Sequence, residues 1–161
     1  MADINQILTS LKRKNSEEIQ TYDEGFLLPG ATNEALEQLA KLSEKYLKQP
    51  LSPEYIECLQ LSDGFSLNGL NIYSSIEKLD PYFLPGIVQV NLAFWQEDFH
   101  RQYIYYGDES QYRLAFDISN KKYVCLDQNK HKALHFFDTF SQLLNAVIIE
   151  ARILNPLPFF S

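Results

Sequence analysis

The chain contains few of the residues that cross-link a fold or carry covalent chemistry. It has two cysteines, Cys58 and Cys125, among 161 residues, which is too few for the disulfide framework of a small secreted scaffold. Both stand among apolar neighbours, so we expect each to pack as a small hydrophobic side chain. The six glycines are scattered singly, so the chain has no glycine-rich phosphate-binding loop, and it has no Gly-x-Ser-x-Gly nucleophile elbow.

Long apolar runs are also missing. No run approaches the roughly 20 residues that a membrane-spanning helix needs. The N-terminal segment, MADINQILTSLKRKNSEE, is charged and amphipathic, without the continuous apolar segment or the small-residue cleavage site of a signal peptide. We therefore expect a soluble, cytoplasmic protein.

Positive charge is scarce. Fourteen basic residues stand against 21 acidic ones, giving a net charge of -7 and a pI near 4.9. This balance disfavours nucleic-acid binding, which needs a basic surface, and docking on anionic membranes. It is compatible with a basic protein partner, and ordinary solubility charge explains it equally well.

What the chain does contain is apolar and aromatic material for one sizeable core. Hydrophobic residues make up 45% and aromatic residues 14% of the sequence, values typical of a globular protein. The order of patterns is helices, then strands, then a helix, which predicts an α+β fold in a single domain spanning residues 1–161. We place its core at about 28–151, with an N-terminal helix over 3–13 and an extended tail over 155–161.

Capping signals define the predicted helices. One runs from about 32 to 48 and is capped by Thr32. A central helix follows Ser52, has Pro53 at its first helical position, and stops at Ser62-Asp63-Gly64. A C-terminal helix starts after Thr139, which forms a capping box with Gln142.

Turn signals separate the predicted strands. Asn68-Gly69 joins two short apolar segments, as in a tight hairpin. Short loops join the later strands, expected at 103–106, 112–116, 123–126 and 133–137, which indicates an antiparallel meander flanked by the helices. Between these parts we expect a helical turn at 74–79, a strand at 87–90 and a short helix over 91–100 capped by Asn91.

No catalytic or metal-binding constellation emerges. His131 and His135 have the spacing of helical metal ligands, but they flank the start of a strand and lack a cysteine pair. The adjacent carboxylates Glu97-Asp98 and Asp108-Glu109 are typical of solvated surface charge. We therefore expect no enzyme activity, no cofactor and no metal.

Polar and aromatic residues at the expected turns are the candidates for partner binding. Their alternative role is to satisfy their own turns, and the alternative for the single tryptophan is a core position. The candidates are Asp63, Asn68, Tyr73, Trp95, Asp108 and Glu109.

Several short motifs follow one another in a recognisable order. They are LSPEY at 51–55, SDGF at 62–65 with Leu67, Gly69 and Ile72, YIYYGD at 103–108, FD at 116–117 and DTF at 138–140 before an apolar helix. In this order they resemble the SUKH superfamily, which includes the Smi/Knr regulators of fungal cell-wall synthesis and many bacterial toxin-immunity proteins. The resemblance covers about residues 28–151. Asp63-Gly64 departs from the Asn-Gly of many members while preserving the turn, and 74–102 adds little.

The resemblance implies an α+β fold without enzymatic activity. It implies an immunity protein that binds and neutralises a cognate toxin, often a nuclease, by blocking it. The alternative is an intracellular regulatory or scaffold module of the Smi/Knr type with several partners. A second alternative is a small-ligand-binding protein or an enzyme whose polar groups converge only in three dimensions.

Overall fold

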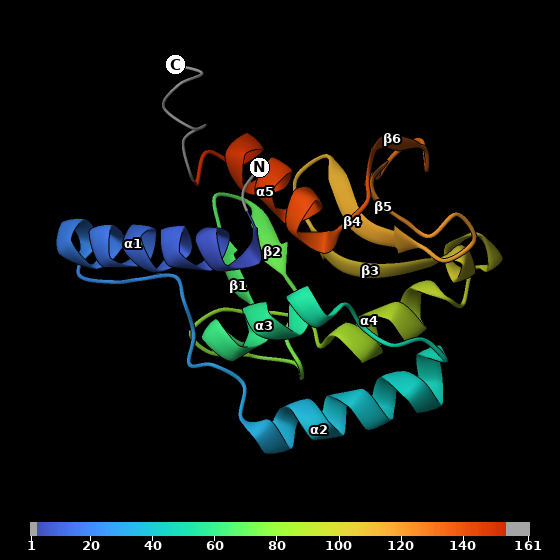
Figure 1. Cartoon of the computed structure of the whole chain (residues 1–161), viewed down its shortest axis with the longest axis horizontal. Coiled ribbons are helices and arrows are strands. Elements are labelled where there is room, and N and C mark those ends of the chain that lie inside the picture. The colour runs from blue at the N-terminus through green and yellow to red at the C-terminus, as the bar shows by residue number, and fades with distance from the viewer. Residues whose placement is uncertain (1–2, 154–161) are drawn as a thin grey trace.

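The fold is a six-stranded antiparallel sheet with helices on both faces (Figure 1). The structure, a computed structural model, describes residues 3–153. The strands follow one another across the sheet in chain order, so the predicted α+β class and antiparallel meander are confirmed. They are β1 (Phe65–Leu67), β2 (Leu70–Ile72), β3 (Tyr103–Asp108), β4 (Tyr112–Asp117), β5 (Lys122–Asp127) and β6 (Ala133–Phe137).

The helices form two layers around this sheet. Helices α1, α3 and α5 pack on one another over one face, whereas α4 packs against β3 from the other. A π-helical turn, η1, continues α2 and contacts α4, and a 3-10 helix, η2, leads into β3. The helical bounds are α1 (Ile4–Tyr22), α2 (Asn33–Leu42), η1 (Ser43–Leu47), α3 (Pro53–Leu61), α4 (Ile87–Phe94), η2 (Asp98–Gln102) and α5 (Phe140–Glu150).

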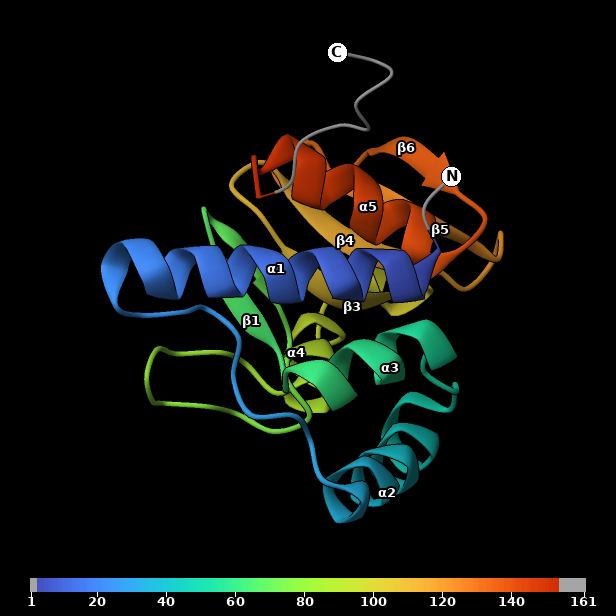
Figure 2. The ribbon, with the colours of Figure 1, turned by 60° about the vertical axis from the view of Figure 1, so that its left-hand side comes forward.

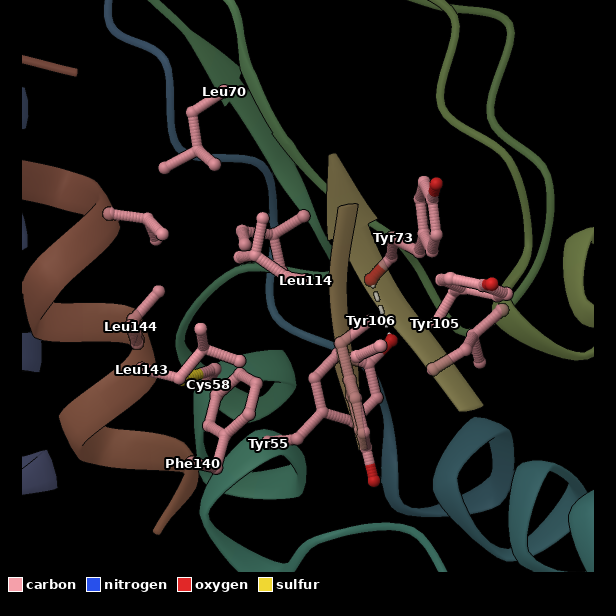
Figure 3. Close-up of a cluster of buried hydrophobic side chains, with 14 of the residues drawn as sticks. Tyr55, Cys58, Leu70, Tyr73, Tyr105, Tyr106, Leu114, Phe140, Leu143 and Leu144 are labelled. Atoms are coloured by element: carbon pink, nitrogen blue, oxygen red, sulfur yellow. Dashed lines mark hydrogen bonds between the residues drawn. The ribbon is translucent and has the colours of Figure 1, made fainter. Parts of the chain in front are cut away.

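Three buried rings join α3, β3 and α5 in the core (Figure 3). The Tyr55 ring centroid lies 4.9 Å from that of Tyr106 and 5.7 Å from that of Phe140, in edge-to-face geometry. The Tyr55 hydroxyl donates to the carbonyl of Tyr73 at 2.6 Å. The Tyr106 hydroxyl accepts from the N–H of Ser52 at 2.9 Å. These bonds fix α3 relative to the sheet, in addition to the apolar packing.

The predicted helix starts are found at the capping residues that the sequence indicated. The hydroxyls of Thr32 and Thr139 cap α2 and α5, and that of Ser52 caps α3. The central helix differs from the prediction at its end: it stops at Leu61 with Ser62 in an extended conformation, and Gly64 takes its left-handed φ of 79° in the turn that leads into β1. One hydrogen bond of the predicted capping box differs. The Gln142 side chain is expected to accept from the N–H of Thr139 but accepts from the N–H of Asp138, one residue earlier.

The N-terminal helix is longer than predicted. It continues from the expected end at residue 13 to Tyr22, since residues 12–22 contain good helix formers and neither glycine nor proline. Asn15 lies on this extension, and its side-chain oxygen accepts from the N–H groups of Phe26 and Leu27 at 2.8 and 3.0 Å. The helix ends at Asp23, which has a left-handed φ of 61°.

The segment between β2 and β3 differs most from the predictions. The strand predicted at 87–90 is wrong, because these residues begin α4, whose Ile87 and Val88 are buried. The helical turn predicted at 74–79 is also wrong, because these residues form part of an extended loop with isolated β-bridges. Asn91 lies buried inside α4 and not at a helix start. Tertiary packing overrides the strand propensity of β-branched residues here. The tail predicted at 155–161 lies outside the described residues.

Candidate functional site

The chain between β2 and α4 forms a closed loop, residues 74–86, that projects from the body below α1 (Figure 2). Lys78 and Leu84 exchange two backbone hydrogen bonds, both of 2.9 Å. At the base, the N–H of Ser74 donates to the carbonyl of Pro85 at 3.1 Å and the N–H of Ile87 donates to that of Ser74 at 2.9 Å. The 74–86 loop is therefore a braced, hairpin-like structure.

Asp63 anchors this loop to the end of the central helix. Its carboxylate accepts from the backbone N–H of Ser75 at 2.7 Å and from the Ser75 hydroxyl at 2.8 Å, and it pairs with the Lys78 ammonium at 2.9 Å. Asp63 is only 3% exposed, so its carboxylate is stabilised by these three contacts within the chain and not by solvent. The structure thus places this candidate beneath the loop and not on the surface.

Tyr82 braces the other side of the loop. Its hydroxyl donates to the carbonyl of Phe26 at 2.7 Å and accepts from the N–H of Ser66 at 3.0 Å. Burial raises the pKa of Tyr82 above the ordinary tyrosine value, so the hydroxyl keeps the proton that it donates at neutral pH. The loop is therefore tied both to the segment before α2 and to β1.

Large apolar side chains stand exposed on the 74–86 loop. Ile76 is 60%, Leu79 71% and Phe83 58% exposed, and we call these three the tip residues. The exposed carboxylates of Glu77 and Asp80 lie between them in the sequence. Because exposed apolar groups on a braced element are typical of protein-binding surfaces, we treat the tip residues with these two acids as the candidate site.

Sequence reasoning missed the tip residues. Their segment follows neither helical nor strand periodicity and is punctuated by Pro81, Pro85 and Gly86. The available signal was the occurrence of large apolar residues in such a segment, where turn-forming loops are usually polar.

Two predicted site residues, Tyr73 and Asp108, are in direct contact at the base of the loop. The Tyr73 hydroxyl donates to one carboxylate oxygen of Asp108 at 2.7 Å, and the side-chain amide of Asn71 donates to the other at 2.9 Å. Burial and then the Asp108 charge raise the pKa of Tyr73, so it remains a neutral donor. The pair ties the end of β2 to the end of β3, directly before the loop begins.

The remaining predicted residues bind other parts of the chain. The Asn68 side chain donates to the carbonyl of Ala151 at 3.1 Å, between the β1–β2 turn and the end of α5. The Glu109 carboxylate accepts from two N–H groups within its own turn. The half-buried Trp95 donates its indole N–H to the carbonyl of Tyr103 at 2.8 Å. The structure does not gather these three with the tip residues.

Nucleophilic groups in the core are held in their neutral forms. Cys58 and Cys125 are both buried, as predicted. Burial raises the pKa of both thiols, that of Cys125 to about 12, which leaves little reactive thiolate at neutral pH. Within residues 3–153, no three histidine, cysteine, aspartate or glutamate side chains gather closely enough to hold a metal ion.

A pocket of about 270 Å³ lies between the start of α3 and the β4–β5 hairpin. Lys121 is its only charged lining residue, and burial raises the pKa of the lining tyrosines Tyr106 and Tyr123. The Tyr106 hydroxyl already accepts from Ser52. The pocket therefore offers hydrophobic and hydroxyl contacts but no acid–base pair. Its lining is Gln49, Pro50, Leu51, Ser52, Pro53, Tyr106, Phe116, Ile118, Lys121 and Tyr123.

Comparison of the chain with protein-family models gives no match, and comparison with curated proteins gives none either. Among the helices of residues 3–153, none combines the length and the apolar character needed to cross a bilayer.

Proposed function

We propose that this chain is a non-catalytic protein-binding module, an immunity protein. It uses the 74–86 loop to bind a cognate protein toxin and neutralise it. The observation that carries the proposal is the exposure of three large apolar side chains on a loop braced by Asp63 and Tyr82. A braced loop loses little conformational freedom on binding, so more of the contact energy appears as affinity.

The charge around the loop favours a partner with a basic surface. Glu77 and Asp80 are exposed, whereas the ammonium of Lys78 is paired with Asp63. The whole chain carries a net charge of -7, which speeds encounter with a positive surface. Surfaces that bind nucleic acid are basic, so a nuclease toxin, the class implied by the resemblance to the SUKH superfamily, fits this charge.

The proposal is tested by co-expressing the chain with the product of a toxin-like reading frame adjoining its own. We expect growth to be restored and the purified proteins to form one stoichiometric complex. Replacing the tip residues together, as Ile76→Ser, Leu79→Ser and Phe83→Ser, should weaken that complex by at least about 100-fold. The matched control is Ile19→Ser with Tyr22→Ser, which removes exposed apolar groups from α1 and should leave the affinity within about twofold.

Different outcomes separate the rival functions. Recovery of several partners from the native cell, with no toxin-like frame adjoining, supports the regulatory or scaffold role. A folded chain that binds no protein at all contradicts the proposal. Stabilisation by a metabolite in a thermal-shift screen, unaffected by the tip substitutions, supports a ligand-binding role instead.

A further inference from the structure

Arg113, on β4, has a guanidinium group that contacts aromatic rings but no hydrogen-bond acceptor. Its Cζ lies 4.9 Å from the ring centroid of Phe94 and 6.0 Å from that of Tyr105. Within residues 3–153 the guanidinium forms no hydrogen bond or ion pair, and its Nη1 is the one buried side-chain nitrogen or oxygen without a hydrogen-bond partner. Such groups are rare in folded proteins, because a buried donor without an acceptor costs free energy.

The ring contacts do not satisfy the N–H groups of Arg113. A guanidinium that lies over an aromatic ring uses its flat face, whereas its five N–H groups point outward in its own plane. The nearest acid along the sheet is Asp108, which stands directly opposite Arg113 in the β3–β4 ladder. The two oxygens of Asp108 accept instead from Asn71 and Tyr73. The Arg113 donors are therefore open to an acceptor that the described residues do not supply.

His100 provides a second donor beside the same aromatic ring. Its ring centroid lies 5.1 Å from that of Phe94, and its Nδ1 lies 2.5 Å from the Tyr105 hydroxyl. Tyr105 is fully buried and its hydroxyl has no other partner in the described part of the chain, so it donates its proton to Nδ1. In a neutral imidazole the other nitrogen then carries the second proton, and Nε2–H of His100 is also a donor without an acceptor.

Positive charge surrounds these two donors, although the whole chain carries a net charge of -7. His131, in the turn between β5 and β6, packs on His100 with the ring centroids 5.5 Å apart, and the lysines on either side of it form no ion pair among residues 3–153. Burial and then the Arg113 charge lower the pKa of His100, and His131 adds to this effect. Glu97 is the nearby acid that acts in the opposite direction. An anion beside His100 would offset the repulsion, whereas a further cation would increase it.

We propose that Arg113 and His100 form a binding site for an oxyanion, the phosphate or carboxylate group of a small molecule, with Phe94 between them. Arginine binds both groups well because its planar N–H edge matches two oxygens at once. Phe94 is the last residue of α4 and the 74–86 loop precedes the first, so the site lies about 10 Å from the base of the loop along the helix. Oxyanion binding therefore goes beyond the proposed toxin binding and is compatible with it.

Titration of the His100 ring signals by NMR, in the full chain, tests the proposal. The probes are sulfate and acetate, which both stay charged above about pH 6, and chloride at equal ionic strength is the reference. We expect a saturable shift of the His100 signals with a Kd of about 1 mM and a rise in the measured pKa of His100, because a bound anion favours the protonated ring. A stronger response to sulfate identifies a phosphate-type ligand, and a stronger response to acetate identifies a carboxylate. No saturable response to either anion beyond that to chloride overturns the proposal.

Replacement of Arg113 tests whether the arginine holds the anion. Arg113→Met keeps an apolar stem over Phe94 without the N–H edge, so the Kd should rise at least about tenfold. The matched control is Arg101→Met, which removes a guanidinium that is 65% exposed and next to His100 in the sequence, and it should change the Kd by less than about twofold. Equal weakening by both variants would show only a general attraction to positive charge and would overturn the site.

A second variant covers the case in which Arg113→Met does not fold, which circular dichroism reveals. Arg113→Lys keeps the charge but replaces the planar edge by a single ammonium, so it should still weaken binding by at least about threefold. Full affinity in this variant would contradict a role for the guanidinium. Replacing the three tip residues by serine should leave the His100 response unchanged, so failure of the oxyanion site and failure of toxin binding are observed separately.

Discussion

The side-chain amide of Asn91 forms two hydrogen bonds with the backbone of Tyr105. The N–H of Tyr105 donates to the amide oxygen at 2.7 Å, and the amide nitrogen donates to the Tyr105 carbonyl at 2.9 Å. Strand β2 pairs in register only with the far end of β3, at Gly107 and Asp108. Trp95, one helical turn after Asn91, donates to the carbonyl of Tyr103. The side chains of Asn91 in α4 and of Trp95, directly after α4, thus replace a neighbouring strand along the first half of β3.

Replacing Asn91 should therefore be costly. Asn91→Ala leaves the buried N–H and C=O of Tyr105 without these partners, so we expect the free energy of unfolding to fall by about 3 kcal/mol. Urea unfolding measures the change. Gln89→Ala removes an exposed amide from the same helix and serves as the control, with an expected change below about 0.5 kcal/mol. Equal effects of the two substitutions would show that the Asn91 bonds contribute nothing.

Gly64 and Gly69 provide a matched pair with positive φ, 79° and 86°. A Cβ at Gly64 would lie 2.8 Å from the carbonyl oxygen of Ile72, whereas one at Gly69 meets nothing within 4 Å. Gly69→Ala should lower the free energy of unfolding by about 1 kcal/mol, through backbone strain alone, and Gly64→Ala by about 3 kcal/mol. Thermal unfolding of both variants checks the order, and a larger loss at Gly69 would contradict the packing around Gly64.

Asp63 should control the order of the 74–86 loop as well as stability. Asp63→Ala removes the acceptor for Ser75 and leaves the Lys78 ammonium unpaired, so we expect a loss of about 3 kcal/mol. Amide hydrogen exchange at Ser75 and Lys78 should accelerate together with this loss. Asp80→Ala, which removes an exposed carboxylate from the same loop, is the control and should leave exchange at these amides unchanged.

His100 should make stability depend on pH below neutrality. Its Nδ1 lies 2.5 Å from the Tyr105 hydroxyl, the ring packs against Phe94, Phe99 and His131, and burial, followed by the Arg113 charge, lowers the pKa of His100. The nearby Glu97 acts in the opposite direction.

The direction of this pH dependence follows from the protonation of His100 in the unfolded and the folded chain. In the unfolded chain the ring takes up a proton near the ordinary pKa of about 6.5, whereas the folded chain resists protonation. Its contribution to stability is therefore complete above about pH 6.5 and decreases as pH falls through the folded pKa. Urea unfolding at several pH values between about 7.5 and 5 measures this slope. His100→Gln should flatten it, and an unchanged slope in that variant would assign the pH dependence to other groups.

Local chemistry made much of the fold predictable from sequence. The caps at Thr32, Ser52 and Thr139, the Asn68-Gly69 turn and the strand-rich region after residue 103 depend on residues within a few positions of each other. The same local rules failed for Ile87 and Val88, whose β-branched side chains favour a strand in isolation. Their helix forms because α4 buries them on the sheet and uses Asn91 to satisfy β3.

For the candidate site too, some features were predictable from the sequence and others depended on tertiary packing. The sequence by itself determined the α+β class, the meander and the acidic charge, because composition, periodicity and capping act over short distances. Only the tertiary structure decided that Asp63 is buried as an anchor, that Tyr73 bonds to Asp108, and that the tip residues are exposed. Exposure and long-range hydrogen bonds depend on which distant segments pack together, and a residue's immediate neighbours in the chain do not encode that.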